Sequence, residues 1–445
     1  MSFRRLPCIP VTRNKRKIAG RVPRIQPRQA RGSNAKQAEQ DGQTTMHPVL
    51  HDKLKADANR LSEALEHMSK LFLAPKEEKT LRSFTTAEVG ELLRVSDGYL
   101  RKAHFDGRIP EVEQGPGNKR LYTADNILEI RNILAQSAKD PYQFLPGRRP
   151  GDKLQIWSTV NFKGGSSKTT TTVTLGMRLA LRGYRVCLVD ADPQASLTTF
   201  FGYQPEIDFR HGGTLYDAIR YNDGDTSRQP ITDVLKGTYF PNLDLVPGGI
   251  MLSEFETETP TALSRGEQPV FFNRIRDSLR QVEDNYDIVL IDCPPQLGYL
   301  TMAAACASTS LLMTVIPERV DLASASQFLT MASGILEVLY TNGGIGAYDN
   351  FAYLLTRFDT AISTQQDLAE WIRELLGESV VKTPFVKSSA VSEAGLSQKT
   401  IFEVDLVGSK NRKTYDRALE SAIGFSNDIE DMIQSAWGRG GIHET

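Results

Sequence analysis

A turn rich in glycine and serine, carrying two lysines, is the segment best suited to chemistry. It lies between a strand predicted over residues 154–160 and a predicted helix, and it consists of Lys163, Gly164, Gly165, Ser166, Ser167, Lys168, Thr169 and Thr170. Such a turn directs successive backbone N–H groups toward one point, which suits a triphosphate. Lys168 is placed to bind the β- and γ-phosphates and Thr169 to bind Mg²⁺. The strict phosphate-loop pattern is not met, because Phe162 and Ser167 occupy positions where it has glycine.

Two further predicted strands end in carboxylates that could complete this site. An apolar run ends in Asp190 and is followed by Asp192, and a second apolar run, 286–292, ends in Asp292. In an open parallel sheet, ligands bind at the carboxyl ends of the strands. One such aspartate alone would more often be a strand-end or turn residue, but three strand ends with matching chemistry indicate a phosphate site.

Together these segments resemble the ParA/MinD superfamily of ATPases, which carry a deviant Walker A motif. The resemblance implies ATP and Mg²⁺ as cofactors, and a homodimer in which Lys163 reaches the partner's nucleotide. It further implies that Asp192 orients the attacking water, while Asp190 and Asp292 hold Mg²⁺ through water. The catalytic residues would then be Lys163, Lys168 and Asp192.

Later apolar runs over 311–316 and 351–356 are predicted as further strands of the same sheet. The second run is followed by Arg357 and Asp359, in a region similar to the one beside the nucleotide base in this family. The fold class expected is therefore α/β, a mostly parallel and doubly wound P-loop sheet.

Residues 84–134 have the order of a winged helix-turn-helix. Thr85 or Thr86 can cap a first short helix, and Ser96 or Asp97 a second. The second helix is predicted to carry Tyr99, Arg101 and Lys102 outward, and a hairpin tip follows with Lys119 and Arg120. The segment resembles the DNA-binding domain of MerR-type regulators, which implies DNA contacts by Ser96, Tyr99, Arg101, Lys102, Lys119 and Arg120. The alternative is a helical hairpin that contacts only protein.

The rest of the chain suggests five parts. Residues 1–45 form a basic arm without an apolar core, which is either disordered or clings to DNA. Residues 46–78 carry an apolar seam at helical spacing, either for dimerisation or for packing against a neighbouring domain. The winged helix-turn-helix would occupy 79–139, a linker rich in proline and glycine 140–152, and the ATPase domain 153–445.

The C-terminal cluster Gly408–Arg417 resembles that of the RepA partition ATPases of replication-and-partition (RepABC) plasmid operons. There, cations near the C-terminus hold nonspecific DNA in the ATP dimer; the matching residues here are Lys410, Arg412, Lys413 and Arg417. A solvated loop is the alternative. The resemblance implies a plasmid partition ATPase, stimulated by a ParB-class centromere-binding partner, that also represses its own operon by binding operator DNA.

Composition sets the remaining expectations. The 445 residues carry 53 Lys and Arg against 54 Asp and Glu, so the chain has no overall basic bias. Four widely spaced cysteines favour a reducing cytoplasm over a disulfide framework. The uncharged run 293–317 is predicted as a buried helix and a core strand rather than a membrane span. We therefore expect a cytoplasmic, nucleoid-associated protein without a membrane partner.

Three other functions compete with partition. One is a transcriptional regulator gated by ATP binding without significant hydrolysis. A membrane-surface ATPase of the MinD kind is disfavoured, because glycines at 438, 440 and 441 break any amphipathic C-terminal helix. An iron–sulfur reductase is disfavoured, because Cys293 and Cys306 lack the glycine-rich surroundings of a cluster site.

Overall fold

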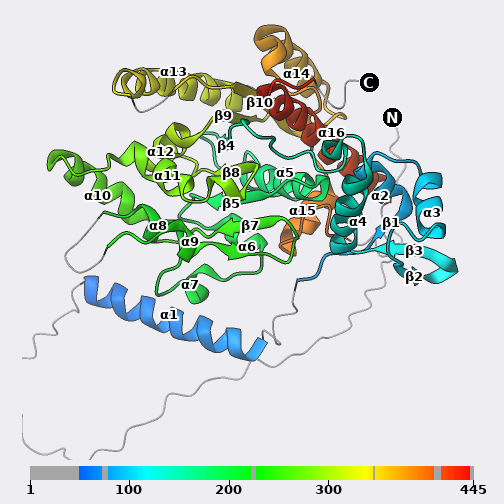
Figure 1. The fold of residues 1–445 in the computed structure, drawn as a ribbon. Coiled ribbons are helices and arrows are strands. Elements are labelled where there is room, and N and C mark those ends of the chain that lie inside the picture. The colour runs from blue at the N-terminus through cyan, green and yellow to red at the C-terminus, as the bar shows by residue number, and fades with distance from the viewer. Residues whose placement is uncertain (1–49, 73–78, 222–226, 344–345, 405–411, 441–445) are drawn as a thin grey trace, which may run out of the picture. The chain divides into compact units, whose positions relative to one another are not determined.

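The computed structural model describes residues 50–72, 79–221, 227–343, 346–404 and 412–440 (Figure 1). The chain divides into two units, residues 1–68 and 69–445, which are treated separately. The predicted basic arm 1–45 and Lys410 lie outside the described residues. The described residues of the first unit all belong to helix α1 (Leu50–Phe72). Leu54 and Leu61 of its apolar seam are 60% and 66% exposed.

The second unit is built on an eight-stranded sheet, with strand order β11-β10-β9-β4-β8-β5-β7-β6. The strands are β4 (Gln155–Val160), β5 (Val186–Asp190), β6 (Lys236–Gly237), β7 (Leu243–Val246), β8 (Ile288–Asp292), β9 (Ser310–Val315), β10 (Asn350–Phe358) and β11 (Phe385–Val386). All neighbouring pairs are parallel except β6 with β7. The predicted mostly parallel sheet and its strands are therefore confirmed.

Helices cover both faces of this sheet (Figure 1). They are α5 (Lys168–Arg182), α6 (Ser196–Phe200), α7 (Pro205–Asp208), α8 (Leu215–Ile219), α9 (Ile231–Val234), α10 (Leu252–Ser264), α11 (Phe271–Arg280), α12 (Tyr299–Ala307), α13 (Arg319–Thr341), α14 (Ser363–Leu376), α15 (Ser389–Leu396) and α16 (Arg412–Ala436). Successive strand residues point to opposite faces, so Leu188 joins one hydrophobic core and Val189 the other. Two cores, one on each face, explain why the strands are apolar along their whole length.

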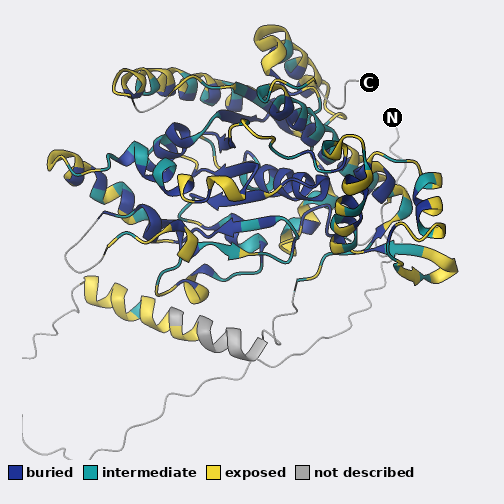
Figure 2. Ribbon diagram, in the orientation of Figure 1, coloured by how far each residue is buried: buried dark blue, intermediate teal, exposed yellow. Residues whose placement is uncertain are grey.

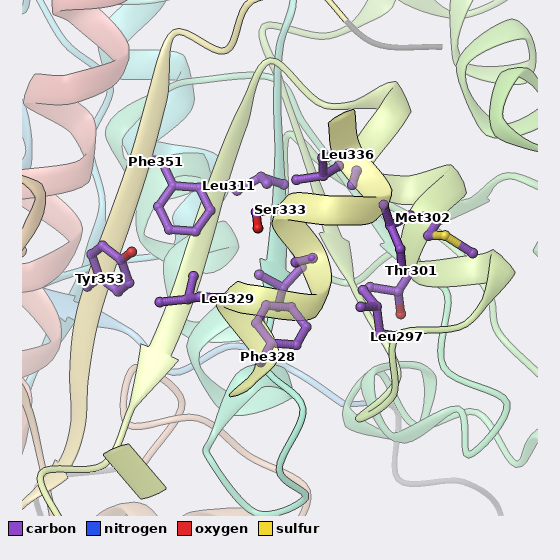
Figure 3. Close-up of a pocket in the computed structure, with 14 residues that line it drawn as sticks. Leu297, Thr301, Met302, Leu311, Phe328, Leu329, Ser333, Leu336, Phe351 and Tyr353 are labelled. Atoms are coloured by element: carbon purple, nitrogen blue, oxygen red, sulfur yellow. The ribbon is translucent and has the colours of Figure 1, made fainter. Parts of the chain in front are cut away.

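The uncharged run 293–317 forms α12 and β9, as predicted. Helix α13 follows it and is, within the described ranges, the one helix long and apolar enough to cross a membrane on length and composition. Its buried residues Phe328, Ala332 and Leu339 belong to the core on one face of the sheet. A cavity of about 190 Å³ remains between this helix, α12 and strands β9 and β10, lined mainly by apolar side chains (Figure 3).

Residues 84–137 have the order of helices and strands that is expected of a winged helix-turn-helix, and they are called the winged domain below. Its elements are β1 (Phe84–Thr85), α2 (Thr86–Leu93), α3 (Asp97–Phe105), β2 (Glu113–Gly115), the 3₁₀ turn η1 (Pro116–Asn118), β3 (Lys119–Tyr122) and α4 (Ala124–Ser137). Thr85 caps α2 in a capping box with Glu88, Ser96 caps α3, and Thr123 caps α4. The two open choices of cap are thus settled as Thr85 and Ser96.

The winged domain is fastened to helix α5 by buried arginines. The last carbonyl groups of a helix have no hydrogen-bond partner within the helix. Leu92 near the end of α2 and Leu181 near the end of α5 carry such groups, and arginine side chains donate to both. Arg131 of α4 donates to the carbonyl oxygens of Leu92 and Leu181 at 2.7 and 3.0 Å. Arg182 also donates to Leu92 O and pairs with Glu430 of α16 at 3.1 Å. The winged domain and the sheet therefore share one core.

Residues 140–152, predicted as a linker, are anchored to neighbouring elements at several points, although about half of them are exposed. The segment starts with the 3₁₀ turn η2 (Pro141–Gln143) and then buries Phe144, whose carbonyl accepts from Arg131 at 2.9 Å. Further on, the backbone N–H of Arg148 donates to buried Asp287 at 3.1 Å. Gly147 has no room for a Cβ, which would lie 2.6 Å from the Asp287 carboxylate. The connection is therefore short and fixed.

Candidate nucleotide site

The phosphate turn joins β4 to α5 through two residues with left-handed backbone. Gly165 has φ +77° and Ser167 has φ +66°. A non-glycine residue in this conformation costs roughly 1–2 kcal/mol, which is the physical reason that the strict pattern has glycine at the Ser167 position. Two strands of the sheet hold the turn in place. Thr314 of β9 donates to the Ser166 hydroxyl and Thr356 of β10 donates to the Ser166 carbonyl, each at 3.0 Å.

The first turn of α5 meets the end of β8 at a buried carboxylate. Thr169 Oγ1 donates to Asp292 Oδ2 at 2.6 Å. The other oxygen of Asp292 is buried and has no hydrogen-bond partner among the described residues. Burial, and next the charge of Asp190, raise the pKa of Asp292, whereas burial lowers the pKa of Lys168. An oxygen left unpaired beside a threonine hydroxyl at a helix N-terminus fits a hydrated Mg²⁺ that accompanies a phosphate.

Asp190 lies opposite Asp292 on the neighbouring strand. Its Oδ2 accepts from the backbone and hydroxyl of Thr198 at 2.8 and 2.7 Å, and its Oδ1 accepts from the N–H of Asp192 at 3.2 Å. Burial raises the pKa of Asp190 to about 7. Both Asp190 oxygens are therefore engaged within the protein, whereas Asp292 keeps one oxygen without a partner among the described residues.

Asp192 is half-buried just after β5. Its Oδ1 accepts from the backbone N–H of Gln194 at 2.9 Å, which turns the chain toward α6. This carboxylate belongs to the same sheet edge as Asp190 and the phosphate turn, and it is close enough to Lys168 and Asp292 to affect their charges.

Lys163 is held by a partner that the sequence did not indicate. Its ammonium donates to Asp321 Oδ2 at 2.7 Å, and its backbone N–H donates to Asn161 Oδ1 at 2.9 Å. Asp321 lies in the first turn of α13 and is buried, and its Oδ1 has no hydrogen-bond partner in the part of the chain described. In the sequence, Asp321 is marked only by its place shortly after a predicted strand, and it lies 158 residues from Lys163.

Arg357 and Asp359 lie at the end of β10 and behave differently. Arg357 has φ +50° and donates to the carbonyl of Gly165 at 3.1 Å, so it touches the phosphate turn itself. Asp359 accepts from the N–H of Ala361 at 3.0 Å, and its own N–H donates to Gln365 at 2.8 Å. Only Arg357 thus has a described hydrogen bond to the turn.

The described residues hold no group of three or more His, Cys, Asp or Glu side chains suited to bind a metal without other ligands. Cys187, Cys293 and Cys306 are buried free thiols. Burial raises the pKa of the Cys293 and Cys306 thiols to about 12. Both side chains therefore lie inside the fold and are not presented at the surface.

The DNA-binding candidates lie on the outer side of the winged domain. Arg101, Lys102 and Lys119 are exposed, and Arg120 is half-buried. The Ser96 hydroxyl accepts from the N–H of Tyr99 at 3.2 Å as the cap of α3. Tyr99 differs from the expectation of an outward ring: it is half-buried against the core because the Arg108 guanidinium covers it, 5.3 Å from the ring centre.

The C-terminal candidates that the structure describes, Arg412, Lys413 and Arg417, fall on the first turns of α16. All three are exposed there, and Arg412 pairs with Asp416 at 3.6 Å. The opposite side of the helix, including Phe425 and Ile429, is buried in the core. These cations are therefore presented from a fixed helix.

Comparison with known proteins agrees with this geometry. A family model described as an AAA domain matches residues 154–342. The chain is 43% identical to a replication protein A of Rhizobium rhizogenes over 389 residues, which cover 87% of this chain and 95% of the relative. It is 31% identical to the chromosome partitioning protein ParA of Caulobacter vibrioides (strain NA1000 / CB15N) over 255 residues, which cover 57% of this chain and 88% of the relative.

The fold has a counterpart among solved structures. The structure of a partition protein superposes with a TM-score of 0.60 at 18% sequence identity, covering 87% of this chain and 99% of the other. That coverage is larger than the sheet domain alone could supply, so the likeness in fold extends into the N-terminal part. Because the sequence similarity runs through nearly the whole of the relatives, and because the phosphate turn and both strand-end carboxylates lie at one sheet edge, the chain belongs to the ParA-type family of P-loop partition ATPases.

Proposed function

We propose that this chain hydrolyses ATP with Mg²⁺ and that ATP closes a homodimer which serves plasmid partition. The observation that carries the proposal is the unpaired buried oxygen of Asp292, next to Thr169 and Lys168 at the N-terminus of α5. A buried polar atom without a partner is costly unless a ligand completes it. A magnesium ion with its nucleotide is a ligand of the required charge.

The residues of the site then have distinct roles. Lys168 and the N–H groups of the turn would hold the phosphates, Thr169 and Asp292 would hold Mg²⁺, and Asp192 would orient the attacking water. Asp190 would act mainly by fixing Asp192 and Thr198, since its oxygens already accept their hydrogen bonds. Bound Mg²⁺ would supply positive charge where charge develops on the phosphates.

Lys163 would act between subunits. In the single chain its ammonium is paired with Asp321, so closing the dimer would exchange this carboxylate for the phosphates of the partner's nucleotide. Helix α1, whose seam residues Leu54 and Leu61 are exposed, would add a second contact between the two copies.

The DNA activities would be divided between two surfaces. The winged domain would bind operator DNA and repress the chain's own operon. The cations of α16 would hold nonspecific DNA in the ATP dimer and so place it on the nucleoid. A ParB-class centromere-binding partner would stimulate hydrolysis and release the dimer.

The test measures molecular mass by light scattering with ADP, ATP and a slowly hydrolysed analogue, together with phosphate release. Wild type should dimerise with ATP and release phosphate faster when duplex DNA and the ParB-class partner are present. Lys168→Ala should lose nucleotide binding, because it removes the chain's own phosphate contact. Lys163→Ala should bind nucleotide but not hydrolyse it, because its contact forms only across the dimer.

Equal loss of nucleotide binding in both lysine variants would overturn the assignment of Lys163 to the partner's site. ATP-dependent binding to operator without phosphate release under any condition would identify a regulator gated by ATP instead of a partition ATPase. Replacing Arg101 and Lys102 by alanine is the matched control, because it should remove operator binding and leave basal phosphate release unchanged.

A further inference from the structure

Helix α3 presents a continuous outer face. Gly98, Arg101, Lys102 and Phe105 are spaced by three and four residues, so they lie along one side of the helix. All four are exposed, whereas Leu100 and Ala103, on the opposite side, are buried.

Phe105 is the unusual member of this face. Its side chain is 91% exposed, although burying a phenylalanine stabilises a protein by roughly 1.5–3 kcal/mol. Its neighbours one turn back are the cations Arg101 and Lys102, which do not extend an apolar patch. An exposed aromatic ring beside two cations fits a surface that carries both negative charge and apolar groups.

The acidic residues of helix α3 and its C-cap, Asp97 and Asp106, are turned to other partners. Asp97, the first residue of α3, lies against α2, where its Oδ1 would be 3.2 Å from a Cβ on Gly90. Asp106 pairs with Arg108 at 3.5 Å. The charge of the face is therefore positive, which favours a polyanion over a second protein surface.

Gly98 lets a partner approach the helix closely. A Cβ at this position would meet only the Ser96 hydroxyl, at 3.8 Å, so the space outside the first turn is open. Phe105 lies seven residues further on, about 10 Å along the helix axis. The major groove of DNA is about 12 Å wide and admits a helix, and its thymine methyl groups are the apolar feature that a phenylalanine contacts.

The end of α3 that carries Phe105 is firmly mounted. The ring of His104 lies 2.9 Å, nitrogen to oxygen, from the hydroxyl of Tyr122 on β3, and the two rings are in contact. Tyr122 is fully buried. This contact fixes the helix end, and with it the position from which the exposed Phe105 ring projects; specificity for a base depends on position as well as on charge.

We infer that Phe105 is a base-reading residue, whose ring contacts a thymine methyl group in the major groove while Arg101 and Lys102 contact the adjacent phosphates or base edges. This inference rests on the proposed binding of operator DNA by the winged domain. It adds sequence selectivity at one base step to that proposal.

The experiment selects duplexes from a randomised pool with the full-length wild-type chain. The selected site should hold an invariant thymine, and replacing that thymine by deoxyuridine, which lacks the methyl group, should weaken wild-type binding. Phe105→Ala should lose about tenfold in affinity for the selected site, within the range expected for one base contact. Its affinity for unrelated duplex DNA and its basal ATPase rate should be unchanged.

The deciding measurement is the combination of the two changes. If the ring contacts the methyl group, deoxyuridine should have no further effect on Phe105→Ala, because each change removes the same contact. Phe105→Leu should recover part of the affinity. Independent effects, equal loss on all duplexes, or a changed oligomeric state with unchanged DNA binding would overturn the inference. If no site is selected, operator binding itself fails; if only the Arg101 and Lys102 variants lose the site, operator binding stands and Phe105 has no part in it.

Discussion

Helices α5 and α13 flank the same sheet, yet they are packed very differently. Thirteen residues of α5 are buried, against five of α13, although α13 is eight residues longer (Figure 2). Helix α5 is enclosed by the sheet, the winged domain and α16, and residues of all three share its core. Helix α13 leaves three large apolar residues exposed among polar ones, namely Val320, Met331 and Val338, and it covers a cavity on its inner side. The helix that follows the phosphate turn is thus enclosed on most sides, whereas the helix that pairs with Lys163 is only partly covered and packs over a cavity.

The largest expected effect comes from removing a buried contact of the enclosed helix α5 with the winged domain. Arg131→Ala should lower the free energy of unfolding by about 3–5 kcal/mol, because it leaves three buried carbonyl oxygens with fewer donors. Urea unfolding measures the loss. The matched control is Lys139→Ala on the exposed connection after α4, which should change stability by less than about 0.5 kcal/mol. Similar values for the two variants would show that the arginine contacts do not fasten the domains.

The next effect depends on pH and on the carboxylates at the sheet edge near the start of α5. Asp190 has its pKa raised to about 7 in the folded chain, against about 3.9 in an unfolded one. Between these values the folded chain holds the extra proton, so its stability should fall as the pH rises from 5 to 8, on the order of a few kcal/mol without Mg²⁺. Asp292 shifts in the same direction.

Urea unfolding at several pH values, without metal, measures this slope. Asp190→Asn should flatten it, since the asparagine does not titrate. Stability that stays level over the same interval would mean that the buried carboxylates are already ionised in the folded chain, because the folded and unfolded chains would then bind the same number of protons.

The smallest effect compares the two helices directly by making the same change, alanine to methionine, once in each helix. Ala180→Met on α5 should destabilise by about 1–3 kcal/mol, because the space beside it is only about 10 Å³. Ala332→Met on α13 should stabilise by up to about 1 kcal/mol, because its side chain can enter the cavity of about 190 Å³. Thermal unfolding of both variants measures the contrast, and two changes of the same sign would remove the distinction between the helices.

The sequence predicted those features that depend on neighbouring residues. The caps Ser96 and Thr123 are local signals, and so are the apolar strands that end in Asp190 and Asp292; the structure has each of them in place. The sequence did not indicate the pairing of Lys163 with Asp321 or the contacts of Arg131, because these join segments far apart in the chain. The prediction that the Tyr99 ring points outward is wrong for a related reason. The ring is covered by the guanidinium of Arg108, which lies beyond the end of α3 and is not part of the helical pattern.

The shared arginine contacts at Leu92 have a consequence for how such chains can be recombined. Two arginines, one from the winged domain and one from α5, donate to a single carbonyl at the end of α2. If the winged domain were replaced by that of a relative with a different end of α2, Arg182 would lose its acceptor at Leu92. Arg182 and its partner Glu430 would then be buried beside a helix end that does not fit them. The winged domain is therefore not an interchangeable module. Under the operator binding proposed above, a change of operator preference is expected to arise by substitution on the outer face of α3 rather than by exchange of the whole domain.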